Sequence, residues 1–209
     1  MTRLVDLSHT VEHGLVTYPG LPAPVICDYW SRDDHDFQIA KIEMVANTGT
    51  YLDTPFHRYA DGADLAHIVL DRCAALPAIV VHAGARAVIG ADAFTGLDVR
   101  GRAVLVHTGW SRHWATDAYA HGHPHLDAGA AIALRDAGAV LVGIDSLNID
   151  DISGSTRPVH ETLLAAGVLI VEHLCNLDQL PDSGFSFTAA PPKFRGVGTF
   201  PVRAFARVP

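Results

Sequence analysis

The feature that most constrains the fold is a series of short apolar runs in the second half of the chain. They cover residues 103–110 (AVLVHTGW), 139–145 (AVLVGID) and 168–174 (VLIVEHL). Each is rich in β-branched side chains and too short for a typical helix. Runs of this kind predict strands that are buried on both faces of a sheet.

Two segments between and after these runs have the features of helices. Residues 126–138 (LDAGAAIALRDAG) place Asp127 as an N-cap before a series of alanines and end on a glycine. Residues 157–167 (RPVHETLLAAG) place Pro158 near the first turn and also end on a glycine. Both segments are therefore predicted to be helices.

Strands that alternate with helices imply a parallel sheet with helical crossovers. The first half of the chain is different, with strand patterns at residues 4–7, 37–45 and 78–83 and Gly- and Pro-rich loops. Residues 37–45 (FQIAKIEMV) nearly alternate, which predicts a half-buried strand, and the tail at residues 199–208 is also strand-like. We therefore expect one α/β domain over residues 1–209, with a mixed sheet that is parallel at its centre and antiparallel elsewhere.

Composition excludes several classes of protein. The chain of 209 residues carries a formal net charge of −8, which disfavours nucleic acid and anionic membranes as partners. Its first residues lack the apolar segment of a signal peptide, and its apolar runs are too short to cross a bilayer. We therefore expect a cytoplasmic protein, whose three cysteines, Cys27, Cys73 and Cys175, are reduced thiols.

The stretch ANTGTYLDTPFH, residues 46–57, concentrates polar groups close to a predicted strand. Pro55 biases Thr54 towards an extended conformation, so the segment is not expected to be helical. Polar residues at strand ends often form the functional site of an α/β sheet. The carboxylate of Asp53 and the imidazole of His57 are thus candidates for acid–base chemistry.

Other polar residues allow more than one interpretation. Glu172 lies in an apolar run, so its carboxylate needs a metal, a raised pKa or an ion-pair partner such as Arg203. Asp145 closes another predicted strand. The histidine-rich residues 121–125 (HGHPH) are expected to form an exposed loop, and Ser146 is only a weak candidate nucleophile because no GxSxG motif is present.

The segment NTGTYLDTPFH resembles the H-x-G-T-H-x-D-x-P-x-H signature of the metal-dependent cyclase/kynurenine formamidase family. Further blocks resemble the same family in the same order: DLSH, TYPG, VLVHTGW, VGIDSLNID, PVHETLLAAGVLIVEHLCNL and PVRAFA. This resemblance covers nearly the whole chain. It implies a swivelling β/β/α fold and a homodimer or homotetramer.

The resemblance also implies roles for particular residues. Family members hydrolyse amides or lactones of small acids, such as N-formylkynurenine or isatin, with zinc or manganese. The signature aspartate corresponds to Asp53 and its final histidine, the general acid/base, to His57. A later histidine and glutamate that bind metal correspond to His160 and Glu172, and an aromatic residue over the substrate corresponds to Tyr18, where formamidases typically have tryptophan.

The chain departs from the family pattern at the first two histidines of the signature, which are replaced by Asn47 and Tyr51. A two-metal site would lose most of one half. Asp53, His160 and Glu172 remain, and three protein ligands with an open position are typical of a catalytic metal. The residues are therefore compatible with one zinc or manganese ion, or with none.

Three functions remain open. The first is hydrolysis of an amide or lactone bond of a small aromatic substrate, with His57 as acid/base and Tyr51 as a hydrogen-bond donor. Tyr18, Asn47 and Trp110 would contact the substrate in this hydrolase, and Trp114 could extend the aromatic wall. The second is a metal-free cyclase, dehydratase or isomerase that uses Asp, His and Tyr for acid–base chemistry, and the third is a non-catalytic protein that binds a small molecule.

Overall fold

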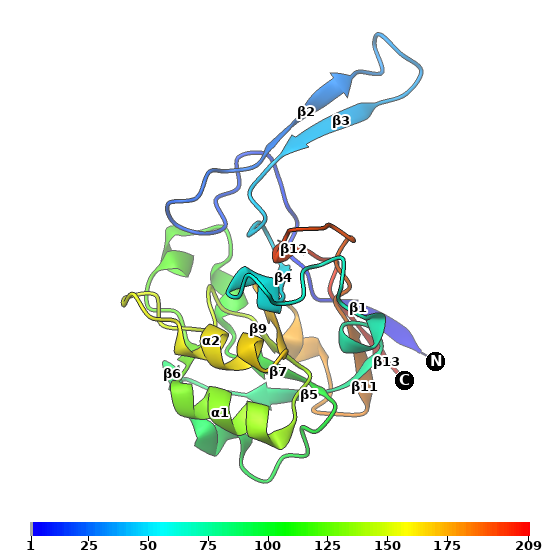
Figure 1. The fold of residues 1–209 in the computed structure, drawn as a ribbon. Coiled ribbons are helices and arrows are strands. Elements are labelled where there is room, and N and C mark those ends of the chain that lie inside the picture. Colours follow the sequence, from blue (N-terminus) through cyan, green and yellow to red (C-terminus); the bar gives the residue numbers. More distant parts are fainter. Residues whose placement is uncertain (1) are drawn as a thin grey trace.

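A mixed sheet of nine strands forms the centre of the protein, described for residues 2–209 by a computed structural model (Figure 1). In spatial order its strands are β1 (Arg3–Asp6), β13 (Phe205–Val208), β11 (Phe185–Thr188), β5 (Leu76–His82), β7 (Ala103–His107), β9 (Leu141–Ile144), β10 (Leu169–Glu172), β4 (Tyr51–Asp53) and β12 (Thr199–Pro201). Strands β5, β7, β9 and β10 are parallel, and the other neighbouring pairs of this nine-stranded sheet are antiparallel. The predicted mixed α/β fold with a parallel centre is therefore confirmed.

The two predicted helices are α1 (Ala128–Ala137) and α2 (Pro158–Ala165), which lie on one side of the central strands (Figure 1). The Asp127 carboxylate caps α1 by accepting a hydrogen bond of 2.7 Å from the amide of Ala130. Gly138 ends this helix with a φ of +86°, which costs a glycine little. Helix α2 starts at Pro158, as its sequence predicts.

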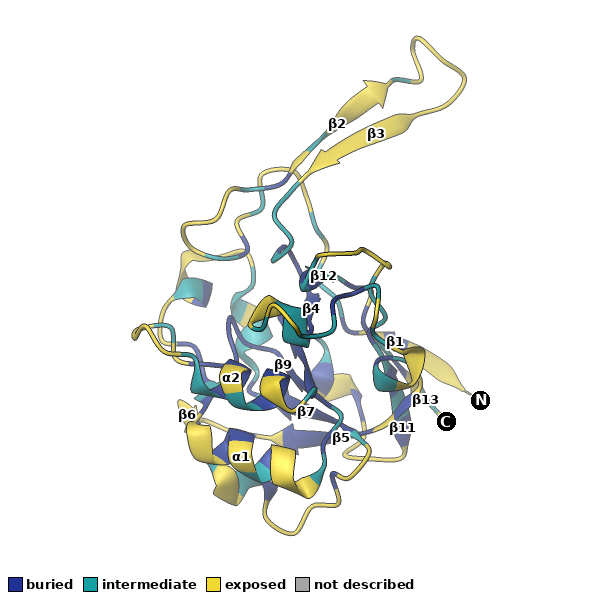
Figure 2. Ribbon diagram, viewed as in Figure 1, coloured by how far each residue is buried: buried dark blue, intermediate teal, exposed yellow. Residues whose placement is uncertain are grey.

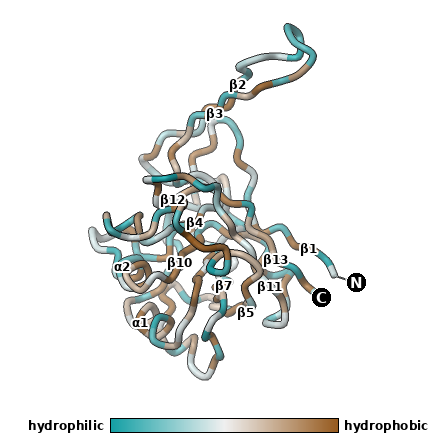
Figure 3. The backbone as a smooth tube through the Cα atoms, turned by 45° about the vertical axis from the view of Figure 1, so that its right-hand side comes forward, coloured by the Kyte–Doolittle hydropathy of each residue, from teal (hydrophilic) through white to brown (hydrophobic). Residues whose placement is uncertain are grey.

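The central strands are covered on both faces. One apolar cluster packs their side chains against the helices, and the other fills the space enclosed by the outer strands of the sheet. Figure 2 shows the central strands as buried, and Figure 3 shows that hydrophobic positions gather along them. This double burial is why the sequences of β7, β9 and β10 are almost continuously apolar.

A separate hairpin projects from the body of the protein (Figure 1). It consists of β2 (Val25–Trp30) and β3 (Ile39–Glu43), which pair only with each other. The prediction of a half-buried strand at residues 37–45 is wrong on burial, because all five residues of β3 are exposed. The hairpin extends away from the core, so neither of its faces is covered (Figure 2).

Several short elements were not apparent from sequence. The polar stretch at residues 46–57 contains strand β4 itself, and the tail splits into β12 and β13 in different parts of the sheet. The remaining strands are β6 (Val88–Ile89) and β8 (His125–Leu126), and the 3₁₀ turns span Pro55–His57, Leu70–Arg72, Ala91–Phe94, Trp110–His113, Asp117–Ala120 and Leu177–Gln179. The prediction that residues 121–125 form an exposed loop holds only in part, because His123 is buried and His125 belongs to β8.

Two further expectations concern the cysteines and the possibility of membrane-spanning helices within residues 2–209. Cys27, Cys73 and Cys175 are all free thiols, as predicted. Over the same residues, no helix combines the length and the apolar composition that a bilayer crossing requires.

Candidate functional site

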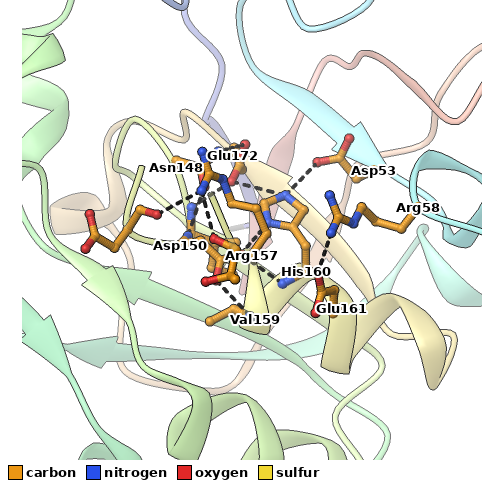
Figure 4. A network of polar contacts seen from close by, with 12 residues as sticks. Asp53, Arg58, Asn148, Asp150, Arg157, Val159, His160, Glu161 and Glu172 are labelled. Carbon is orange, nitrogen blue, oxygen red and sulfur yellow. Dashed lines mark hydrogen bonds and ion pairs between the residues drawn. The ribbon is translucent and has the colours of Figure 1, made fainter. Parts of the chain in front are cut away.

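Three side chains from distant parts of the sequence converge at one end of the sheet (Figure 4). Strands β4 and β10 are antiparallel neighbours, and they carry Asp53 and Glu172. His160 lies on α2 beside them, with its Nε2 atom 3.7 Å from Asp53 Oδ2 and 3.7 Å from Glu172 Oε1. The three residues expected to hold a metal are thus brought together, and all are buried.

Asp150 fixes the orientation of His160. Its carboxylate accepts hydrogen bonds from the Nδ1 of His160 at 2.6 Å and from the amides of Val159 and His160 at 2.8 and 2.9 Å. A carboxylate only accepts hydrogen bonds, so the imidazole proton resides on Nδ1 and the lone pair on Nε2. The same contacts satisfy free amides in the first turn of α2.

The Nε2 of His160 therefore faces two buried carboxylates, an arrangement that attracts a positive charge, either a proton or a metal ion. Burial by itself lowers the pKa of His160, but the hydrogen bond with Asp150 and the nearby carboxylates of Asp53 and Glu172 raise it to about 10. Burial raises the pKa of Glu172 to about 7. Burial also acts to raise the pKa of Asp53, but contacts with His160 and His57 outweigh it and hold the pKa below its usual value.

A second chain of hydrogen bonds orients His57. The hydroxyl of Thr199 donates to Asp53 Oδ1 and lies 2.8 Å from the Nδ1 of His57. Because the hydroxyl proton is used on Asp53, the Thr199 oxygen accepts the Nδ1 proton of His57. The Nε2 atom of His57, whose side chain is 32% exposed, is left with a free lone pair.

The two residues that replace the signature histidines are placed next to this site. Tyr51 donates its hydroxyl hydrogen bond to Glu172 Oε2. Burial, with the charges of Glu172 and Asp53, raises the pKa of Tyr51 well above its usual range, so its phenol stays neutral. Tyr51 therefore offers no phenolate ligand, and Asn47 offers only its amide.

The remaining partners of Glu172 are also local. Its carboxylate accepts hydrogen bonds from the Ile149 amide at 2.6 Å and from the Asn148 side chain at 3.3 Å. The alternative of an ion pair between Glu172 and Arg203 is wrong. Arg203 pairs instead, at 2.6 Å, with Asp6 of the edge strand β1.

A cavity of about 180 Å³ opens onto these groups. Tyr18, Leu21, Asn47, Tyr51, His57, Arg58, Asn148, Arg157, His160 and Glu172 line it. Two of the three expected substrate contacts, Tyr18 and Asn47, are thus at the cavity. The third, Trp110, lines a different cavity and donates its indole hydrogen bond to the carbonyl of Tyr119 at 3.0 Å.

Two other candidates also lie away from this cavity. Trp114 stacks on His9, with ring centroids 3.9 Å apart, and lines a third cavity. Asp145 closes β9 as predicted, but its carboxylate accepts hydrogen bonds from Thr108 and from the amide of Gly109 at 2.6 to 2.8 Å. It therefore stabilises the turn that follows β7.

The donor set fits a single cation. Within residues 2–209, Asp53 Oδ2 is buried and has no hydrogen-bond partner. Ligand atoms of Asp53, His57 and His160 all lie within 4.8 Å of one another, and Glu172 Oε1 is close to the same imidazole. Carboxylate oxygens with a neutral imidazole are typical ligands of zinc and manganese.

Sequence reasoning did not identify Asp150, Thr199 or Arg157. Asp150 lies eight residues before the start of α2, and no capping motif has that spacing. Thr199 is 146 residues from Asp53, and only sheet pairing between β4 and β12 brings them together. The one local signal for Asp150 was its position in the loop after β9, because polar residues that follow a strand often belong to the functional site.

Comparison with known proteins places the chain among enzymes of one family. Residues 5–151 match the family described as "Putative cyclase". The kynurenine formamidase of Geobacillus thermodenitrificans is 27% identical over 210 residues, which cover 99% of this chain and 98% of that protein. A solved structure described as a predicted metal-dependent hydrolase from Bacillus stearothermophilus is 27% identical, with a TM-score of 0.83 and coverage of 99% and 98%.

Isatin hydrolase A from Labrenzia aggregata has the same fold, with a TM-score of 0.86 over 99% of this chain and 94% of that chain, at 22% identity. The resemblance inferred from the sequence blocks is confirmed, because the family match spans most of the chain. The protein belongs to the family of cyclases that this match describes.

Proposed function

We propose that the protein is a hydrolase that uses water to cleave the C–N amide bond of a small aryl formamide, or the corresponding lactone bond. One observation carries this proposal: the Nε2 atom of His160 faces two buried carboxylates, next to the oriented imidazole of His57. The similarity to a kynurenine formamidase over the whole chain supports the amide class and the aromatic substrate.

Asp53 and His160 are the residues that would hold one divalent ion, with Glu172 Oε1 as a further donor. Zinc and manganese are the two candidates from the donor chemistry. An ion bound there supplies Lewis acidity, which polarises a carbonyl and lowers the pKa of water. Tyr51 keeps Glu172 in place through its hydroxyl hydrogen bond.

His57 provides the proton transfers. Its Nε2 removes a proton from the attacking water as the water oxygen forms a bond to the substrate carbonyl carbon. When the C–N bond breaks, the imidazolium returns this proton to the leaving nitrogen, so that an aryl formamide yields formate and an arylamine. Thr199 and Asp53 hold the ring in the required tautomer and stabilise its positive charge.

Hydrolysis of N-formylkynurenine by purified protein tests this function, with zinc or manganese added back after chelation. Asp53→Asn and His57→Gln should each lower kcat by about 10²- to 10⁴-fold. His121→Gln is the matched control, because His121 is exposed and outside the cavity. If neither metal supports hydrolysis of aryl formamides or aryl lactones, the proposal fails.

The same assays separate the two alternatives. If thoroughly chelated protein converts a substrate into a product that has not gained a water molecule, this would favour the metal-free cyclase, dehydratase or isomerase. Tight binding of an aromatic ligand without turnover under any condition would favour the non-catalytic function.

We further propose a cytoplasmic homodimer or homotetramer in which the β2–β3 hairpin contacts a second copy. The hairpin exposes apolar side chains on two strands that the rest of residues 2–209 leaves uncovered. Trp30 and Ile42, one from each strand, are 40% and 57% exposed. Light scattering on Trp30→Ser/Ile42→Ser protein should show a smaller assembly than the parent, and an unchanged mass would contradict the contact.

A further inference from the structure

A pair of histidines lies outside the candidate active site, at the carboxyl ends of two neighbouring parallel strands. His82 ends β5 and His107 ends β7, and the two residues are paired in the register of the sheet. Their Nδ1 atoms are 3.0 Å apart, with ring centroids separated by 5.2 Å. The side chains are 51% and 22% exposed, so both rings are in contact with solvent.

Carboxylates lie behind both rings. The Nε2 of His82 is 3.0 Å from Asp182 Oδ1, and the Nε2 of His107 is 4.0 Å from Asp145 Oδ2. Asp182 requires a proton on the Nε2 of His82, which leaves a lone pair on the Nδ1 of that ring. Asp145 is too far from His107 for a hydrogen bond, so only its negative charge favours a proton on the facing Nε2 of that ring.

In this tautomer both Nδ1 atoms carry a lone pair, and the two atoms are 3.0 Å apart. Two lone pairs at such a distance repel each other unless both nitrogens share a cation. The cation can be a proton, which requires one ring to change tautomer or to become charged, or it can be a metal ion. A metal allows both rings to keep the proton on Nε2, facing a carboxylate, which is the arrangement found behind most metal-bound histidines.

We propose that His82 and His107 bind one divalent transition-metal ion of the imidazole-preferring class, such as zinc, nickel or copper, through both Nδ1 atoms. Metal–nitrogen bonds of about 2.0–2.1 Å place two ligands of one ion about 2.9–3.4 Å apart for angles between 90° and tetrahedral. The observed 3.0 Å falls within this interval. Water completes the coordination sphere, and magnesium and calcium are excluded because they prefer oxygen ligands.

This site shares no residue with Asp53, His57, His160 or Glu172. The protein should therefore bind zinc at two independent places, one of which does not affect hydrolysis. Binding to the histidine pair also releases the proton that the rings share in the absence of metal.

Metal content after dialysis against zinc, measured by mass spectrometry, tests the site. His82→Ala and His107→Ala should each bind one zinc ion per chain fewer than the parent, while their circular dichroism and hydrolase activity are unchanged. His121→Ala, which removes an exposed histidine elsewhere, should bind as much zinc as the parent. Equal zinc content in all four proteins would overturn the proposal.

Electron paramagnetic resonance with copper(II) gives a second measurement. After the ion at Asp53 and His160 has been blocked with zinc, one copper per chain should show hyperfine coupling to two equatorial nitrogens. Either alanine variant should lose this signal or retain coupling to a single nitrogen. A two-nitrogen signal that persists in both variants would place the copper elsewhere and overturn the proposal.

Discussion

At the scale of single residues, the chemistry depends on which nitrogen of each imidazole carries the proton. Asp150 fixes this for His160, and Thr199 fixes it for His57. Neither residue needs to touch the substrate. Both act by leaving a lone pair on Nε2, where a ligand to metal or a general base must have one.

Asp150→Asn tests this orientation. An amide in place of the carboxylate removes a charge-assisted hydrogen bond from His160 Nδ1 and weakens the preference for the correct tautomer. Affinity for zinc and kcat/KM should each fall about 10- to 100-fold. Asp151→Asn, at the neighbouring exposed aspartate, is the matched control and should stay close to the parent in calorimetric zinc titrations.

Arg157 suggests how the cavity selects its substrate. One of its guanidinium nitrogens, Nη1, donates to the carbonyls of Gly154 and Thr156 at 2.7 and 2.8 Å, which anchors the side chain beside the cavity. Within residues 2–209 no carboxylate forms an ion pair with it. The neighbouring Arg58, by contrast, pairs with Glu161 at 2.5 Å.

Arg157→Gln should therefore raise KM for a carboxylate-bearing substrate such as N-formylkynurenine by about 10- to 100-fold, as loss of one charge-assisted hydrogen bond predicts. Uncharged formanilide should be hydrolysed as before. Arg58→Gln serves as the comparison and should change KM less, because the charge of Arg58 is already neutralised. Equal effects of Arg157→Gln on both substrates would contradict recognition of the carboxylate.

At the scale of elements, the two helices differ in the origin of their caps. The cap of α1 is local, since Asp127 immediately precedes the helix and bonds to the amide of Ala130. The cap of α2 comes from Asp150, which lies in the loop after β9. Helix α1 was therefore predictable together with its cap, whereas for α2 only the proline and the closing glycine were visible.

Asp127→Ala should lower the free energy of unfolding by about 1 kcal/mol, since the first turn of α1 loses its cap. Asp127→Asn should retain most of this stability because asparagine is a comparable cap. Urea denaturation measures both changes. Asp136→Ala, near the C-terminal end of the same helix, is expected to be nearly neutral, and a loss as large as that of Asp127→Ala would argue against capping.

At the scale of the whole molecule, the curled sheet buries ionisable groups that a flat surface would leave in water. His173 is fully buried, and its Nδ1 is hydrogen-bonded to the hydroxyl of Tyr119 at 2.8 Å. Burial lowers the pKa of His173 to about 3. The folded protein therefore cannot take up a proton that the unfolded chain binds below about pH 6.5.

His173 thus penalises the folded state only under acidic conditions. Stability should fall relative to a His173→Gln variant as the pH decreases from about 6.5 to 4, by at most about 1.4 kcal/mol per pH unit. The raised pKa of Glu172 acts in the opposite direction, but it is present in both proteins and cancels in the comparison. Parallel stability curves for the two proteins, from urea unfolding at each pH, would show that His173 is not the cause.

The sequence by itself determined the elements whose signals are local. The apolar runs of β5, β7, β9 and β10, the cap of α1 and the proline of α2 all report burial or backbone geometry within a few residues. The order of strand and helix then implied the parallel centre of the sheet. Asp53, His57, His160 and Glu172 were identified through the resemblance of whole blocks to one family.

Only the tertiary structure decided what depends on contacts across the sheet. The pattern of residues 37–45 predicts a strand but carries no information on whether the rest of the chain covers it, so the exposed hairpin was not foreseen. Trp110 and Trp114 follow a strand end as the site residues do, yet they pack around other cavities. Thr199 acts through Asp53, which is distant in sequence, and Asp150 acts through His160, with which it forms no local motif. The distances between these partners are set by antiparallel strand pairing and by helix packing. No spacing in the sequence predicts them.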